Sequence, residues 1–308
     1  MIDHIRRRRI LGAMLAAPAM AMLPAGVFAQ GLSSTALADR LWLIQGAGAN
    51  VVVAEGNTGV VVVDGGDRAN AEALLAEINR LTGNKPVSVL FNTNWRPEHT
   101  GLNHLLGGTG TRIIAHENTR LWQTADFHVD WEGRDYTPLP KAAQANESFY
   151  KKGAFHEDGL NIEYGYLMQA HTDGDIWVRF ADQDVLVVSD LVRNHQFPVM
   201  DYRTGGWIGG MRDASQALAA MAGEATRVIP AEGGVLGRQA LVDQHEMLAV
   251  AYEVVGDAYR SGWSLEDFRA SNPVERIGQG WGEPDLFLQQ AYRGTWYHVP
   301  GRAVRNVI

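Results

Sequence analysis

The sequence predicts an α/β protein in which two halves, each made of strands and helices, share one hydrophobic core. Short runs rich in β-branched residues alternate with turns in both halves of the chain. Stretches with apolar residues at helical spacing follow the strands in each half. The chain has 308 residues, of which 46% are hydrophobic, and this is enough material for one large core. Together these observations favour a layered domain in which helices cover sheets.

The first 29 residues have the pattern of an export signal. Four arginines at positions 6–9 precede an apolar run at 10–23, which is too short to span a membrane, and the segment ends in Val27-Phe28-Ala29. We expect cleavage after Ala29. The stretch from Arg7 to Leu11 resembles the twin-arginine type of signal, and an ordinary secretory signal is the alternative. The sequence therefore predicts a periplasmic or secreted protein, with the signal at 1–29 and the folded domain at 30–308.

Charge and composition narrow the range of partners. Without residues 1–29 the chain has 23 basic and 34 acidic residues, a net charge of −11 with neutral histidines. Such a protein is not expected to bind nucleic acid or to insert stably into a membrane, so the expected partner is a small-molecule substrate or ligand. The chain has no cysteine, which excludes a thiolate nucleophile and leaves His, Asp and Glu as metal ligands.

The first half reads as a strand meander followed by a helix and further strands. The meander strands are predicted at 41–44, 51–54 and 60–63. A helix is predicted between Asp67 and Gly83, followed by strands at 87–91 and 111–115. The polar stretch that follows the strand at 111–115 and extends to about Tyr150 contains proline and glycine, and we expect it to be a loop that covers the site.

The second half repeats this theme and ends in helices. Strands are predicted at 162–168, 176–180, 185–188 and 227–229, with a helix at 213–222. From about residue 238 the pattern is mainly helical, with Ser264 as a helix cap and a further helix beginning near 281–284. No linker separates this tail, so we assign it to the same domain.

Four polar loops, each directly after a predicted strand, carry the residues that could bind a ligand or take part in a reaction. Functional side chains tend to collect in such loops. The loops are Asn94–His99, Ala170–Asp175, Ser189–Leu191 and Ile229–Gly233.

Taken in order over residues 41–234, these loops resemble the active-site motifs of the metallo-β-lactamase superfamily. The resemblance implies a four-layer αββα sandwich with a C-terminal helical extension, and a hydrolase whose site holds two metal ions. In that family the first loop reads His-x-His-x-Asp-His, whereas this chain has Asn94, Arg96, Glu98 and His99.

The other three loops supply the remaining family positions. The resemblance places His171 as a metal ligand of the first ion site, Asp190 as the bridging aspartate, and Glu232 where a final histidine ligand is usual. Three of the seven family ligand types are therefore kept, namely His99, His171 and Asp190. The ligand positions at Asn94 and Arg96 are degenerate.

The changes alter the charge of the expected metal site. Glu98, Asp190 and Glu232 contribute three negative charges and Arg96 one positive charge, so the net charge is about −2. This matches one divalent ion and not two, because a guanidinium cannot ligate a metal. We expect either no ion or one ion of zinc, manganese or iron, with ligands drawn from Glu98, His99, His171, Asp190 and Glu232. Arg96 is expected to pair with Asp190 or Glu232. Glu98 and Glu232 have two open roles, either as metal ligands or as partners of Arg96.

Three functions remain open at this point. The first is a hydrolase-like enzyme that acts on a small ester, amide, lactone or thioester, with Asp190, Glu98 and Arg96 as catalytic residues. The second is a non-catalytic protein that binds an anionic ligand or a partner in a pocket centred on Arg96. The third is an acid/base enzyme that uses arginine and carboxylates without a metal. Trp95 and Trp207 are candidates for the walls of a substrate pocket, and packing in the core explains them equally well.

Overall fold

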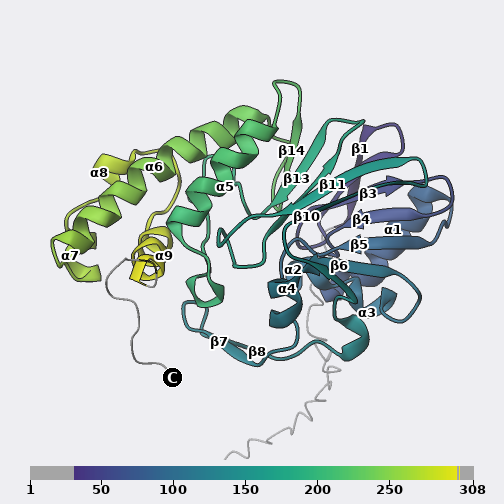
Figure 1. The fold of residues 1–308 in the computed structure, drawn as a ribbon, viewed down its shortest axis with the longest axis horizontal. Coiled ribbons are helices and arrows are strands. Elements are labelled where there is room, and N and C mark those ends of the chain that lie inside the picture. Colours follow the sequence, from purple (N-terminus) through teal and green to yellow (C-terminus); the bar gives the residue numbers. More distant parts are fainter. Residues whose placement is uncertain (1–30, 297, 299–308) are drawn as a thin grey trace, which may run out of the picture. The chain divides into compact units, whose positions relative to one another are not determined.

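The computed structural model describes residues 31–296 and 298. The predicted signal at 1–29 lies outside these residues. The described chain is a sandwich of two β-sheets with helices on both outer faces (Figure 1). The predicted four-layer α/β arrangement with additional C-terminal helices is confirmed.

The first sheet has seven strands in the order β1-β2-β3-β4-β5-β6-β9. Their bounds are Ser33–Ala38, Leu41–Gln45, Val51–Glu55, Val60–Val63, Val87–Phe91, Arg112–His116 and Glu147–Phe149. The strands β2 to β4 form the predicted meander, and β1 adds an antiparallel strand at its edge that was not predicted. The strands β4, β5, β6 and β9 run parallel. Parallel neighbours need crossover connections, and these contain α1 (Ala71–Thr82), α2 (Pro97–Thr100), α3 (Asn103–Leu106) and α4 (Glu117–Trp122).

The second sheet has five strands in the order β10-β11-β12-β13-β14. Their bounds are Lys152–Glu157, Leu160–Tyr166, Ile176–Phe180, Val185–Ser189 and Arg227–Pro230. Only β13 and β14 are parallel, and α5 (Ile208–Met221) lies in the connection between them. The predicted site residues lie in the loops that follow β5, β11, β13 and β14.

Alternating side chains divide the hydrophobic interior into layers. In β4, Val61 and Val63 face the second sheet, whereas Val60 and Val62 face α1. Both faces of this strand are therefore buried, which explains its unbroken apolar run. On the outer face of the second sheet, α5 and α6 close a third cluster that includes Leu218.

The C-terminal helices extend this third cluster. They are α6 (Arg238–Arg260), α7 (Leu265–Ala270), α8 (Val274–Ile277) and α9 (Asp285–Trp296). Ser264 caps α7 in a reciprocal box with Asp267, as its sequence context predicts. Phe268 and Phe287 pack into the same core as α5, so the helices are continuous with the sandwich. Within residues 31–296 and 298, we find no helix that combines the length and apolar character of a membrane span.

The stretch expected to be a covering loop is more structured than predicted. It contains α4, a small hairpin of β7 (Phe127–Val129) and β8 (Arg134–Tyr136), the turn Lys141–Ala143, and β9 at the sheet edge. The hairpin strands have only three residues each, which is too short for a recognisable alternation of apolar and polar residues. The hairpin matters for the site, because its turn carries Trp131 and Glu132.

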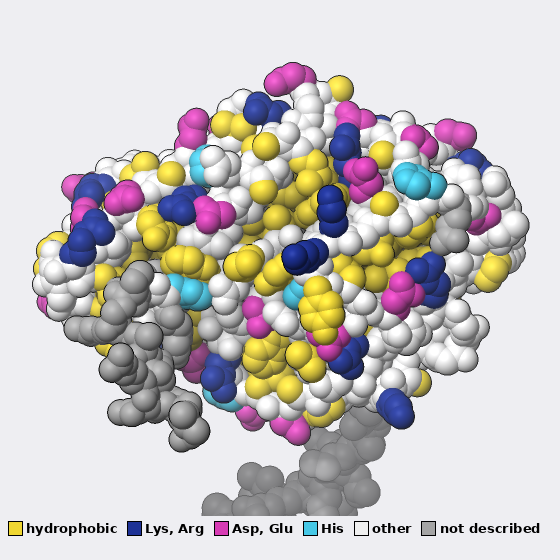
Figure 2. All heavy atoms as spheres, in the orientation of Figure 1, with side chains coloured by type: hydrophobic (Ala, Val, Ile, Leu, Met, Phe, Trp, Pro, Cys, Tyr) yellow, Lys and Arg dark blue, Asp and Glu magenta, His cyan; other side chains and the backbone are white. Residues whose placement is uncertain are grey.

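Basic and acidic side chains are interspersed on the face of the molecule seen in Figure 2, with hydrophobic side chains between them. A nucleic-acid surface usually shows a continuous basic stripe, and this face has none among its described side chains.

Candidate functional site

A buried cluster of hydroxyl groups and a carboxylate ties three strand ends together. Asp64, directly after β4, accepts hydrogen bonds from the backbone N and Oγ1 of Thr93 at 2.9 and 2.8 Å and from Oγ of Ser189 at 3.2 Å. Asp64 and Ser189 both have left-handed backbones, with φ of 66° and 50°. Such conformations cost energy in non-glycine residues and tend to occur at functional sites. Our sequence analysis missed Asp64, although a polar residue directly after a buried strand was a usable signal.

Gly101 allows α2 to approach this cluster closely. A Cβ atom at this position would lie 2.4 Å from the carbonyl oxygen of Gly66. The backbone N of Gly101 donates to that same oxygen at 2.7 Å. Only glycine fits such an approach, and it holds α2, which carries His99, against the end of β4.

His99 is fully buried between two carboxylates. Its Nδ1 lies 3.0 Å from Oδ2 of Asp64, and its Nε2 lies 2.8 Å from Oδ2 of Asp190. Burial by itself lowers the pKa of an imidazole, but the two negative charges outweigh this and hold the pKa of His99 well above its usual value. In this arrangement His99 is a cation at neutral pH.

His171 approaches the same carboxylate from the second half of the chain. Its Nδ1 is 2.9 Å from the carbonyl oxygen of Val199, which can only accept, so Nδ1 is the donor. Its Nε2 therefore points elsewhere and lies 3.7 Å from Oδ2 of Asp190. Among the described residues, neither this Nε2 nor that of His99 has a hydrogen-bond partner of good geometry. Two buried imidazole nitrogens thus converge on one carboxylate oxygen.

Asn94 supports the Asp190 carboxylate from the first loop. Its Nδ2 donates to Oδ2 of Asp190 at 2.8 Å, and its Oδ1 accepts from the backbone N of Arg96 at 2.9 Å. Burial raises the pKa of Asp190, but the positive charge of His99, the proximity of His171 and the bond from Asn94 hold it well below its ordinary value. Asp190 is therefore ionised.

Arg96 pairs with Glu98, one of the two roles left open for that carboxylate, but the prediction that it pairs with Asp190 or Glu232 is wrong. Its Nε donates to Oε1 of Glu98 at 2.8 Å, its Nη2 pairs with Glu132, and its Nη1 lies 3.9 Å from Oδ2 of Asp201. The rings of Trp95 and Trp131 flank the guanidinium, with their centroids 5.4 and 5.6 Å from its Cζ. Glu132 and Trp131 reach Arg96 because the hairpin β7–β8 folds over it. Three carboxylates surround this cation, so it has no excess positive charge to attract an anionic ligand.

The two other predicted carboxylates lie in different surroundings. Glu98 is one-third exposed and bonded to Arg96, which together with His99 lowers its pKa against the raising effect of burial. Glu232 is 67% exposed and pairs with Arg193, with Nη2 and Oε2 2.6 Å apart. Glu232 therefore pairs with a different arginine from the one predicted.

The two predicted pocket tryptophans line different cavities. Trp95 packs against Phe127 and Tyr136 and lines a cavity between α2 and the hairpin. Trp207 precedes α5 and lines a cavity among the C-terminal helices. They do not wall a common pocket.

One divalent ion fits the donors at this site better than two. Asn94 and Arg96 are engaged in hydrogen bonds as donors, so a two-ion centre does not fit. His99, His171 and Asp190 offer two imidazole nitrogens and a carboxylate, which is a suitable set for one ion.

The three groups are close together but not yet arranged as ligands. Within residues 31–296 and 298, no three His, Asp or Glu side chains have the arrangement of a metal site. Two ligands of a tetrahedral ion with bonds of about 2.0–2.1 Å lie about 3.3 Å apart. The atoms Nε2 of His99 and Oδ2 of Asp190 are 2.8 Å apart, so ion binding requires a small separation and loss of the His99 proton.

Comparison with known proteins agrees with this fold. A family model described as the metallo-beta-lactamase superfamily matches residues 45–231. None of the curated proteins gives a significant match. A metallo-beta-lactamase from Pontibacter korlensis is similar in structure, with a TM-score of 0.57 and 19% identity over 71% of this chain and 99% of that protein. The DIM-1 metallo-beta-lactamase has a TM-score of 0.58 and 17% identity over 71% of this chain and 98% of its own.

A larger structure covers more of this chain. The stereoselective inverting sec-alkylsulfatase Pisa1 from Pseudomonas sp. has a TM-score of 0.63 and 15% identity over 89% of this chain. This chain spans only 51% of that protein. At these identities, all three similarities describe the fold alone.

Proposed function

This chain belongs to the metallo-β-lactamase superfamily, whose model matches residues 45–231, and we propose that it is an exported, hydrolase-like enzyme that uses one divalent metal ion. The proposed substrates are small esters, amides, lactones or thioesters. Export to the periplasm or the exterior is proposed from the basic and apolar pattern of residues 1–29.

One observation carries the metal-dependent function. The Nε2 atoms of His99 and His171, neither of which has a hydrogen bond of good geometry among the described residues, face the same Oδ2 atom of Asp190. Each imidazole is oriented through its other nitrogen, His99 by Asp64 and His171 by the carbonyl of Val199. Metal-ligating histidines in proteins commonly have such supporting contacts.

The charge around these residues also favours a cation. Five carboxylates lie in the connected cluster, and Arg96 and protonated His99 supply two positive charges. The carboxylates are Asp64, Glu98, Glu132, Asp190 and Asp201. A cation is attracted to such a surplus of negative charge, whereas an anionic ligand is repelled.

We assign the following roles to the residues of the chain. His99, His171 and Asp190 hold the ion, and a bound zinc, manganese or iron ion would polarise a substrate carbonyl and activate water. Glu98 is ionised and one-third exposed, so it is placed to accept a proton from water at the rim of the site. Arg96 is a positioning residue, because its guanidinium holds Glu98 through a 2.8 Å bond.

The test of this proposal is metal analysis followed by an activity screen. The mature protein is stripped with a chelator, reloaded separately with zinc, manganese and ferrous iron, and analysed for bound metal. We expect about one equivalent of one of these ions, and loss of that ion in His171→Ala and Asp190→Ala. Glu232→Gln is the matched control, since Glu232 is exposed and pairs only with Arg193 among the described side chains. Chromogenic esters, lactones and thioesters then report hydrolysis.

A metal-free protein is the second candidate, and the contact between His99 and Asp190 favours it. At 2.8 Å this contact is an ion pair that already neutralises Asp190. In this case the protein is a binding protein or an acid/base enzyme without metal. Uptake of less than about a tenth of an equivalent of every ion after reloading would establish this second candidate and refute the first.

A further inference from the structure

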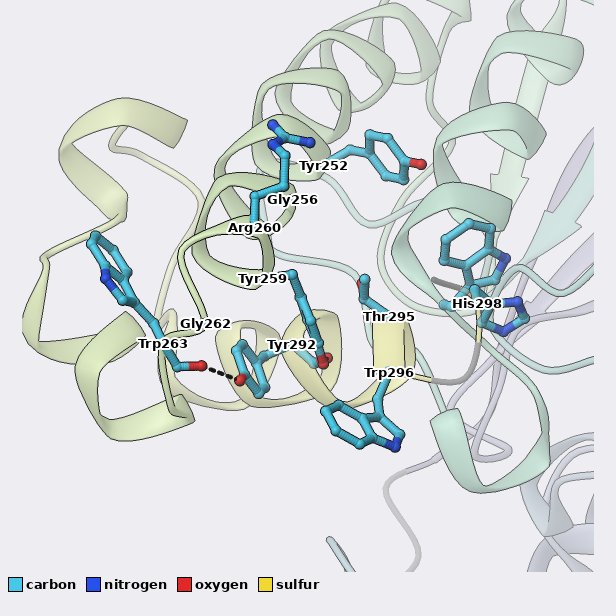
Figure 3. A pocket seen from close by; sticks show the side chains of 11 residues that line it. Tyr252, Gly256, Tyr259, Arg260, Gly262, Trp263, Tyr292, Thr295, Trp296 and His298 are labelled. Atoms are coloured by element: carbon cyan, nitrogen blue, oxygen red, sulfur yellow. Dashed lines mark hydrogen bonds between the residues drawn. The ribbon is translucent and has the colours of Figure 1, made fainter. Parts of the chain in front are cut away.

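A second cavity, with a volume of about 340 Å³, lies among the C-terminal helices (Figure 3). Its walls come from α6, α9, the segment before α5 and the turn after α6. Aromatic side chains form most of these walls, namely Trp207, Tyr252, Tyr259, Trp263, Tyr292, Trp296 and His298. None of His99, His171 and Asp190 lines the cavity. It is therefore distinct from the candidate metal site.

Three hydroxyl groups of the walls are satisfied by the protein itself. The hydroxyl of Tyr292 donates to the carbonyl of Trp263 at 2.5 Å (Figure 3), and the hydroxyl of Tyr259 donates to the carbonyl of Tyr292, also at 2.5 Å. Oγ1 of Thr295 donates to the carbonyl of Ala291 at 2.8 Å. The cavity thus presents mainly ring surface, and a ligand gains most from apolar contact.

Ring orientation adds a preference for flat ligands. The rings of Tyr259 and Tyr292 are nearly parallel, with 20° between their planes and centroids 4.6 Å apart. The rings of Trp207 and His298 are stacked in the same way, at 14° and 4.1 Å. Walls built from such ring pairs offer faces and edges to which a planar aromatic molecule can pack, and an alkyl chain gains less from them.

The charge of the lining argues against a cationic ligand. Aromatic cages recognise quaternary ammonium groups, but the described lining residues include no carboxylate to attract a cation, and the charged side chain among them is the basic Arg260. Its Nη2 is bonded to Oδ1 of Asp257 at 2.7 Å, and Oε2 of Glu253 lies 3.7 Å away. Its charge is thus balanced by acidic groups outside the lining, so it offers little to an anion.

We propose that this aromatic cavity is a binding site for an uncharged aromatic molecule of one or two fused rings. The volume lies at the lower end of the range of small-molecule pockets, which sets this upper limit on size. The site is independent of the metal-dependent function proposed above, because the two share no residue.

Trp207 connects the cavity to the loop that carries His171. Its backbone N donates to the carbonyl of Gln169 at 3.2 Å, and the preceding Gly206 is so close that a Cβ there would lie 2.1 Å from the carbonyl oxygen of His171. The cavity is therefore joined through Trp207 to the backbone of that loop.

The test is calorimetric titration of the metal-free protein with 2-naphthol as the probe. We expect saturable binding of one molecule, at least about tenfold tighter than binding of 1-octanol. Tetramethylammonium is the cationic comparison, and we expect no measurable heat of binding. Tighter binding of 1-octanol or of tetramethylammonium than of 2-naphthol would overturn the assigned ligand class.

Position 256 provides a matched pair of variants. Gly256 lies on α6 in the cavity lining, and a Cβ there would meet only the flexible end of Arg260, at 3.1 Å. We expect Gly256→Ala to bind 2-naphthol within about threefold of the parent, and Gly256→Leu to bind at least about tenfold more weakly because its side chain fills the cavity.

A second variant removes a wall without filling the space. Trp263 is 42% exposed, so Trp263→Ala should fold, and we expect it to weaken 2-naphthol binding by about three- to tenfold. No binding to the parent, or equal binding to the parent, Gly256→Leu and Trp263→Ala, would refute the proposal. Binding of 2-naphthol that appears only in a chain shortened to residues 1–298 would also refute the proposal, because residues 299–308 would then be what occupies the cavity in the full chain.

Discussion

His99 and Asp190 meet at 2.8 Å although they come from different halves of the chain. His99 follows β5 on α2, and Asp190 follows β13 in the second sheet. The contact is completed by Asp64 on the other ring nitrogen of His99, at 3.0 Å. The site is therefore held together by protonated His99, a buried cation between two carboxylates. A metal ion can bind to His99 only if it replaces the proton on Nε2.

Arg96 should contribute strongly to stability. We expect Arg96→Ala to lower the free energy of unfolding by about 3 kcal/mol, because it leaves the partly buried Glu132 and the buried Asp201 without their cation. Urea unfolding of the metal-free protein measures this. The control is Arg193→Ala, which breaks a pair with the 67% exposed Glu232 and should cost less than about 1 kcal/mol. Equal effects of the two variants would contradict our account of the site.

The hairpin β7–β8 should depend on Glu132. This carboxylate pairs with Arg96 and also accepts from the hydroxyl of Tyr136 at 2.5 Å. We expect Glu132→Gln to speed amide hydrogen exchange in residues 127–136 by about tenfold, the scale of losing one charged hydrogen bond. Asp135→Asn is the control, because Asp135 is 85% exposed and bonds only His128 among the described side chains. If both variants exchange alike, Glu132 does not anchor the hairpin.

Asp175 should make stability depend on pH. Burial raises the pKa of this carboxyl to about 7, against the lowering effects of His171 and of the bonds from Thr172. Its pKa in the unfolded chain is about 3.9. The folded state therefore holds the proton more tightly, and stability falls as pH rises from about 4 to about 7.

The matching variant is Asp175→Asn, which cannot ionise. We expect its melting temperature, measured in the presence of a chelator, to decline less between pH 5 and pH 7 than that of the parent. The reference is Asp213→Asn, whose carboxylate is 63% exposed and should leave the pH profile unchanged. Identical slopes for the parent and Asp175→Asn would show that Asp175 does not titrate in this range.

Export predicts a shortened chain in the cell. We expect the mature protein to begin near Gln30 and to be found outside the cytoplasm, because residues 6–29 have the pattern of a cleavable signal. Mass spectrometry of protein from separated cell fractions measures both. Replacement of Arg7 and Arg8 by lysine should reduce export if the signal is of the twin-arginine type and should change little for an ordinary secretory signal. A full-length cytoplasmic chain would contradict the prediction.

Much of the fold could be predicted because the relevant patterns are local. The all-valine run of β4 marks a strand buried on both faces, and the structure places its side chains alternately against the second sheet and α1. The resemblance of the four polar loops to the metallo-β-lactamase motifs predicted that His99, His171 and Asp190 belong to one site. The structure brings these three together, because strand ends at one edge of a sandwich are neighbours in space.

The sequence by itself predicted the strands β2 to β6 and β11 to β14 in their order along the chain and the helix cap at Ser264, and it missed β1 and β7 to β10. The resemblance of its polar loops to a known family predicted the three residues at the centre of the site. Only the tertiary structure decided which carboxylates hold Arg96 and that Trp95 and Trp207 face different cavities. Arg96 and Glu132 are 36 positions apart, and the hairpin that joins them has strands of three residues. Periodicity and spacing predict the helix or strand to which a residue belongs. They do not predict its contacts with residues far away in the sequence, because those contacts form only when distant segments pack together.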